Sequence, residues 1–121
     1  MTQKQLDEKI KKIKAQILKI ESMRPGKITK QYNVCGVAGC RCKDKKNPQK
    51  HGPYFNLNYA YLGKKKTQFI RDQFAEKIEM QNINFKKFKE LMQMWITLEI
   101  ERSNLDMKTE IEKINAEKLK K

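Results

Sequence analysis

Apolar residues near both ends of the chain recur at alternating intervals of three and four. Near the N-terminus this spacing is kept by Leu6, Ile10, Ile13, Ile17 and Ile20. Because an α-helix turns once in about 3.6 residues, these side chains form one apolar stripe on a helix that is otherwise rich in lysine and glutamate. The pattern predicts a helix over residues 3–22, which Pro25 and Gly26 end.

A second helical pattern fills the C-terminal part of the chain, with Asp72 as its expected N-cap. Its first apolar stripe holds Phe88, Leu91, Trp95 and Leu98, and a neighbouring stripe holds Met92, Ile96, Ile100, Met107, Ile111 and Ile114. We expect one helix over most of residues 85–118, about 50 Å long, with Asn82 and Asn84 as interruptions before it. A helix of this length needs a partner, so we expect the N-terminal helix, a second copy of the chain, or both to cover it.

The middle of the chain predicts a small β-hairpin. Apolar side chains alternate along residues 54–62, where one face holds Phe55, Leu57, Tyr59 and Tyr61. We interpret this face as the buried side of a strand, joined by a turn at 63–65 to a second strand at 66–70. A further short strand is expected at 28–34, and the glycines, prolines and lysines of 35–53 predict irregular backbone.

The positive charge of the chain is concentrated in its middle third. The whole sequence has 28 basic and 14 acidic residues, and residues 26–71 hold 11 of the basic and only 1 of the acidic ones. This excess indicates a polyanionic partner, with nucleic acid the commonest candidate and an anionic membrane surface a weaker one. The alternative interpretation is a lysine-rich surface that serves solubility alone.

The three cysteines lie in one short motif, Cys35-Gly-Val-Ala-Gly-Cys40-Arg-Cys42, and the only histidine, His51, follows it. If the chain is extended at Cys40 and Cys42, both thiolates point to one side and reach a single ion. With Cys35 and His51 they would form a closed tetrahedral site, which suits structural zinc because no position stays open for water. The alternatives are reduced cysteines on a packed loop, a redox-sensing thiol pair, and a histidine that lies in a surface turn.

The residues around this motif supply candidate contacts to nucleic acid. Lysine and arginine suit phosphate binding, and an exposed tyrosine suits stacking on a base. The candidates are Lys30, Tyr32, Arg41, Lys43, Lys45, Lys46, Lys50, Tyr54, Lys64, Lys65 and Lys66, with the last three expected at the tip of the hairpin.

Several classes of protein lack support in the sequence. Leu, Ile, Val and Phe account for 27 of the 121 residues, which indicates a thin core and argues against an enzyme with a deep apolar pocket. The sequence has no GxxxxGK[ST] loop, no GxSxG and no HExxH motif, and one histidine offers little acid–base chemistry. From the thin core and the missing motifs we expect that the protein is not an enzyme. No apolar run suits a membrane span or a signal peptide, so we also expect a cytoplasmic protein.

Residues 32–69 resemble a family of short uncharacterised bacterial and archaeal proteins. The shared core reads CGxxxCxC, then HGPYY, then a strand, a glycine turn and a helix rich in glutamate, lysine and leucine. The matching positions are Cys35, Gly36, Cys40, Cys42, His51, Gly52, Pro53 and Tyr54, while Phe55 stands where many members have a second tyrosine. The resemblance implies a shared set of metal ligands. It also implies a nucleic-acid setting, because members are often encoded near transposases and other mobile elements.

Together these observations predict a mainly helical α+β protein. Residues 1–25 form an amphipathic helix, residues 26–71 a basic module of zinc-knuckle loop and β-hairpin, and residues 72–121 a long helix. The two helices are expected to pair as an antiparallel, coiled-coil-like stalk that supports a homodimer. We expect residues 27–71 to bind the phosphates of DNA or RNA. The competing hypotheses are a helical protein-interaction adaptor, whose lysines serve solubility only, and a thiol-based redox switch.

Overall fold

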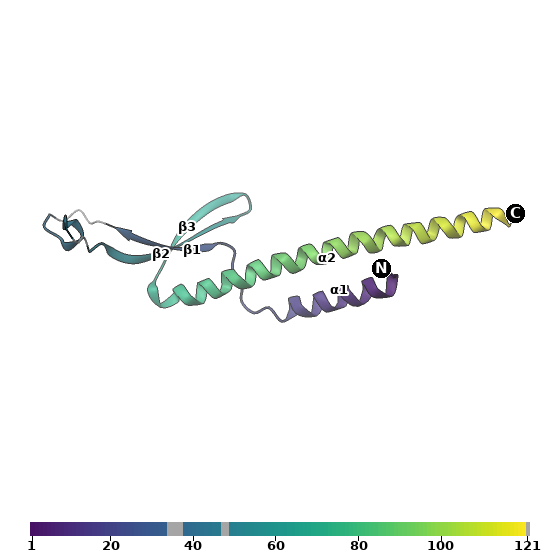
Figure 1. The fold of residues 1–121 in the computed structure, drawn as a ribbon, viewed down its shortest axis with the longest axis horizontal. Coiled ribbons are helices and arrows are strands. Elements are labelled where there is room, and N and C mark those ends of the chain that lie inside the picture. Colours follow the sequence, from purple (N-terminus) through teal and green to yellow (C-terminus); the bar gives the residue numbers. More distant parts are fainter. Residues whose placement is uncertain (34–37, 47–48, 121) are drawn as a thin grey trace. The chain divides into compact units, whose positions relative to one another are not determined.

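The computed structural model describes residues 1–33, 38–46 and 49–120. In chain order the elements are α1 (Gln3–Leu18), β1 (Lys27–Asn33), the short 3-10 helix η1 (Arg41–Lys43), β2 (His51–Tyr61), β3 (Lys64–Ile70) and α2 (Asp72–Leu119) (Figure 1). The predicted α+β class with mainly helical content is therefore confirmed. Within the described ranges, neither long helix has a stretch apolar enough to cross a membrane.

Internal contacts divide the chain into two units. The helical unit consists of Met1–Glu21 and Lys87–Lys121, and the sheet unit consists of Ser22–Lys86. The division falls inside α2, so this one helix contributes its first turns to the sheet unit and the rest to the helical unit.

A capping box starts α1. The backbone N–H of Gln5 donates to the Thr2 hydroxyl at 3.2 Å, and the N–H of Thr2 donates to the side-chain oxygen of Gln5 at 3.0 Å. These two bonds satisfy donors that have no partner within the helix. The predicted end at residue 22 is wrong, because α1 ends at Leu18 and the N–H of Lys19 closes its last turn on the carbonyls of Gln16 and Ile17.

The core of the helical unit is the seam between α1 and α2. The buried side chains are Leu6, Ile10 and Ile13 from α1 and Leu91 and Leu98 from α2, with Ile17, Ile20, Trp95 and Leu105 packed around them. Asp7 bonds to Arg102, and Lys14 lies 5.0 Å from the centre of the Trp95 ring, so the residue numbers run in opposite directions. The helices are therefore antiparallel, as expected (Figure 1). From the first stripe of α2, Leu91, Trp95 and Leu98 pack against α1.

A small polar network borders this seam. Arg102 donates to Asp7 at 3.1 Å and to both carboxylate oxygens of Glu99 at 2.6 and 2.8 Å. The indole N–H of Trp95 also donates to Glu99, at 3.2 Å. The hydrogen bond from Arg102, followed by the one from Trp95, holds the pKa of Glu99 below its ordinary value of 4.5.

The long helix α2 has no interruption at Asn82 or Asn84, contrary to expectation. The amide of Asn82 donates to the carbonyl of Arg24 at 3.0 Å, and that of Asn84 donates to the carbonyl of Ser22 at 2.9 Å. Asparagine interrupts a helix when its side chain bonds to the local backbone, whereas both amides here bond to a distant segment. These two bonds give the carbonyls of Ser22 and Arg24 partners outside a helix. The segment after α1 therefore does not need helical hydrogen bonds, which explains why α1 ends before it.

The sheet unit contains three strands where the sequence predicted a hairpin and a separate short strand. The order is β1-β2-β3 and both pairings are antiparallel, with Leu57 of β2 opposite Ile28 and Gln68. The turn between β2 and β3 consists of Leu62 and Gly63, whose φ angles of 50° and 78° suit a two-residue hairpin turn. The predicted turn at residues 63–65 therefore starts one residue too late and ends two residues too late.

One face of this sheet is covered and the other is open. On the covered face Leu57 is fully buried, Ile70 is buried, and Phe55 and Tyr59 are half-buried, whereas Tyr61 of the predicted buried face is exposed. Gly26 lies against β2 at a φ of 116°, and a Cβ atom there would be 2.6 Å from the carbonyl oxygen of Asn58. Only glycine allows the chain to approach β2 this closely before β1 begins.

Candidate metal centre

The loop between β1 and β2 carries a short 3-10 helix. Cys40 precedes it in extended conformation, and the N–H of Lys43 donates to the carbonyl of Cys40 at 3.0 Å. The carbonyl of Arg41 accepts from the N–H groups of Asp44 and Gln49, at 3.2 and 2.9 Å. The sequence argument that both thiolates reach one ion assumed an extended chain at Cys40 and Cys42, whereas only Cys40 is extended and Arg41–Lys43 form a 3-10 turn.

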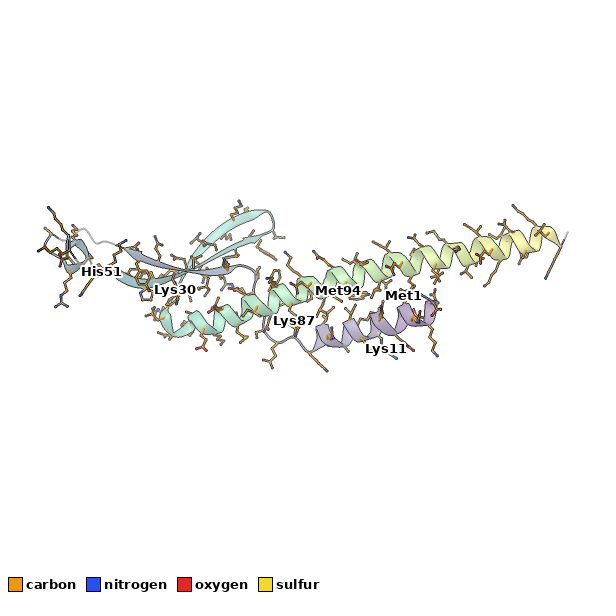
Figure 2. The ribbon with its side chains drawn as sticks, in the orientation of Figure 1. Met1, Lys11, Lys30, His51, Lys87 and Met94 are labelled. Atoms are coloured by element: carbon orange, nitrogen blue, oxygen red, sulfur yellow. The ribbon has the colours of Figure 1, made fainter. Side chains whose placement is uncertain are left out.

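This turn brings three predicted metal ligands together. The ligand atoms of Cys40, Cys42 and His51 all lie within 4.8 Å of one another, and Cys40 Sγ lies 3.2 Å from His51 Nε2. Cys42 is buried and the other two are half-buried. His51 is the first residue of β2, so its backbone is fixed by pairing with Asn33 of β1 where the loop meets the sheet (Figure 2). Cys35, the fourth predicted ligand, lies outside the described residues.

The donor set matches the chemistry of a soft or borderline metal ion. Thiolate and imidazole are the usual ligands of zinc, at about 2.3 and 2.0 Å, and a tetrahedral site separates two such sulfur atoms by roughly 3.7 Å. The ligand atoms of Cys40, Cys42 and His51, which all lie within 4.8 Å of one another, are near this spacing. The three side chains are therefore close enough to bind one metal ion.

The predicted nucleic-acid contacts are all exposed, but they occupy different surfaces. Arg41, Lys43, Lys45, Lys46 and Lys50 lie in or beside the cysteine loop, Lys30 and Tyr32 lie on β1, and Tyr54 lies on β2. The expected basic tip at Lys64 to Lys66 is wrong in detail, because all three belong to β3 and pair with Tyr61, Ala60 and Tyr59. Successive strand residues point to opposite faces, so the three lysines do not form one cluster.

Two features of the sheet unit have no counterpart among the predicted site residues. Phe69 is 59% exposed on β3, although strand alternation alone suggested no role for it. Arg24 donates to the side-chain oxygen of Gln68 and lies 5.1 Å from the centre of the Tyr59 ring. Neither feature has a local signal, because both depend on which strands pair across the sheet.

Residues 3–80 match the model of a protein family described as a domain of unknown function, DUF6788. No curated protein and no solved structure matches the chain.

Proposed function

We propose that this chain, which belongs to the DUF6788 family, is a small nucleic-acid-binding module whose cysteine loop is folded around a structural zinc ion. The observation that carries the proposal is the concentration of positive charge beside the cysteine–histidine cluster. Residues 26–71 hold 11 basic residues and 1 acidic residue, and β1, β2 and β3 contain no acidic residue at all. A surface of this kind attracts phosphates and releases the counterions bound to them.

The role proposed for the metal is to fold the loop. Two thiolates and an imidazole close around an ion and fix residues that otherwise have few apolar contacts, and Cys42 is the one buried side chain among the described loop residues. This would hold Arg41 and Lys43, on either side of Cys42, in fixed positions for phosphate contacts. We place the protein in the cytoplasm, where reducing conditions keep cysteines available as thiolates. We also propose a setting near mobile elements, which the sequence resemblance implies.

The test of nucleic-acid binding is the dependence of affinity on salt. We expect the logarithm of the association constant for duplex DNA to fall linearly with the logarithm of salt concentration, with a slope of about −0.9 per phosphate contacted. A triple variant with Lys64, Lys65 and Lys66 changed to glutamine should have a shallower slope, measured by fluorescence anisotropy.

The matched control changes Lys108, Lys113 and Lys118 to glutamine. These three lysines lie on α2, so the variant loses the same charge from residues 72–121, which hold 10 basic and 10 acidic residues. Its slope should equal that of the wild type. Equal slopes for both triple variants would remove β3 from the interface, and absence of binding at low salt would contradict the proposed function.

One observation favours the expected homodimer over the competing adaptor role for the helices. The second apolar stripe of α2 remains exposed, with Ile96, Ile100, Met107 and Ile111 all more than half exposed. These four residues are separated by intervals of four, seven and four, so the spacing is the same in both directions from the midpoint between Ser103 and Asn104. A second copy of the helix in antiparallel orientation would therefore present the same spacing to the first. We therefore propose a homodimer through this coiled-coil-like stripe as the second candidate role.

Sedimentation equilibrium tests the dimer. Ile100→Glu should shift the chain to a monomer, because it places a charge in the apolar interface. Thr109→Glu adds the same charge on another side of α2, where the hydroxyl bonds to the carbonyl of Leu105, and should leave the dimer intact. A wild-type chain that is monomeric at all concentrations would contradict the homodimer.

A further inference from the structure

The open face of the sheet is polar and exposed. Residues that alternate with buried Leu57 along β2 point to this face, together with their neighbours on β1 and β3. Asn58, for example, lies opposite Lys27 and Thr67, and all three are exposed. Within the described part of the sheet unit, nothing buries this face as Leu57 is buried on the other side.

Hydrogen bonds connect the side chains of the open face across all three strands. The amide of Asn56 donates to the side-chain oxygen of Gln31 at 3.0 Å, and the amide of Asn58 donates to the hydroxyl of Thr29 at 3.4 Å. The hydroxyl of Thr67 donates to the amide oxygen of Asn58 at 2.8 Å. Each amide has two donor hydrogens and two acceptor positions, so these bonds orient the amides and leave further bonding capacity towards solvent.

Two aromatic rings lie beside these amides. Phe69 is directly opposite Asn56, and Tyr54 lies two residues before Asn56 on the same face, so the two rings are diagonal neighbours. They are 59% and 37% exposed. A hollow of about 390 Å³ is lined by Gln31, Asn33, His51, Tyr54, Asn56 and Phe69. The open face therefore offers flat apolar rings and amide groups within one depression.

The charge around the hollow favours an anionic ligand. The three strands have no acidic residue, and Lys27 and Lys65 lie on the open face with the aromatic rings. A duplex hides the faces of its bases and presents mainly phosphates and groove edges, to which an exposed phenyl ring contributes little. Unpaired bases present their flat faces, which stack on aromatic side chains, and their edges, which bond to amides.

We propose that the open face binds unpaired bases of a single-stranded nucleic acid. Tyr54 and Phe69 stack on bases, the amides of Gln31 and Asn56 bond to base edges, and Lys65 contacts phosphate. The inference rests on the proposed nucleic-acid function and names the substrate class of the same basic module.

The experiment compares two probes of equal length and charge, using the full chain purified without chelator. One probe is a labelled oligothymidylate, and the other is an abasic strand that keeps the phosphates and lacks the bases. Fluorescence anisotropy should show that the wild type binds the oligothymidylate at least about tenfold more tightly. The double variant Tyr54→Leu and Phe69→Leu should bind both probes with the affinity that the wild type has for the abasic strand.

Two further variants separate stacking from damage to the fold. Tyr61→Leu makes the same change at an exposed tyrosine of β2 that points to the other face, and it should keep the preference for bases. Phe69→Tyr retains an aromatic ring and should keep it as well. Equal affinity of the wild type for both probes would overturn the stacking proposal while leaving phosphate binding in place. Failure to bind either probe at low salt would overturn the single-strand proposal, and failure to bind duplex DNA as well would overturn the proposed function itself.

Discussion

The two units of this chain are stabilised by different means. The helical unit buries Leu6, Ile10, Ile13, Leu91 and Leu98 in one continuous seam. The described part of the sheet unit buries Leu57, Ile70 and Ala75 together with Cys42, and its open face is held by hydrogen bonds between polar side chains. The comparison suggests that the helices supply stability by apolar burial, while the sheet unit devotes most of its surface to polar and charged groups.

The two units also differ in their charge. The sheet unit has 14 basic and 4 acidic residues, and the helical unit has 14 basic and 10 acidic residues. Net positive charge raises the free energy of a compact unit through self-repulsion, so this excess has a cost in stability. An unbalanced charge beside a small core is more easily explained by binding than by folding.

The largest expected effect on this comparison comes from the apolar seam. Leu6→Ala should lower the free energy of unfolding of the helical unit by about 3 kcal/mol, because it removes a fully buried side chain and leaves a cavity. Urea denaturation followed by circular dichroism measures the loss. Leu18→Ala makes the same change at an exposed residue of the same helix and should have an effect of less than about 0.5 kcal/mol. Equal losses for the two variants would contradict the assignment of the core.

A smaller effect is expected where α2 holds the segment before β1. Asn82→Ala should cost about 1 to 2 kcal/mol of unfolding free energy, because it leaves the carbonyl of Arg24 without its half-buried donor. Asn84→Ala removes a bond that is exposed to water and should cost less than about 0.5 kcal/mol. Amide hydrogen exchange within β1 is the measurement, and faster exchange in the Asn84 variant than in the Asn82 variant would contradict this ranking.

The smallest expected effect is the pH dependence of the helical unit. The pKa of Glu99 is lowered by folding, so the bonds from Arg102 and Trp95 contribute stability above pH 4.5. This contribution is lost as the pH falls below 4.5 and the carboxylate is protonated. The thermal midpoint should therefore fall less steeply with acid in Glu99→Gln than in the wild type. Parallel pH profiles of the two proteins would rule out this contribution.

The parts of the fold that could be predicted from the sequence are those set by local spacing. The intervals between Leu6, Ile10 and Ile13 predicted α1 and its apolar face, because neighbouring turns alone determine them. The end of α1 could not be predicted in this way, since the segment that follows is bonded by Asn84, which is 62 residues from Ser22. Asn82 and Asn84, which were predicted to interrupt α2, instead bond to the segment before β1.

The candidate site was predicted as a set of residues but not as a geometry. The clustering of Cys40, Cys42 and His51 followed from their residue types and closeness in sequence. The open sheet face could not be predicted from residue types, because it depends on the pairing of β1 with β2 across the whole cysteine loop. Phe69 gains its possible role only when that pairing places it beside Asn56 and Tyr54.

The metal centre is the central claim, and native mass spectrometry tests it most directly. The chain, purified without chelator, is weighed under native conditions and again after acid denaturation. The account predicts that the native mass is higher by a single zinc ion per chain, and that Cys42→Ser or His51→Ala removes the difference while α1 and α2 stay folded. Equal masses of the wild type in both conditions would contradict the metal centre.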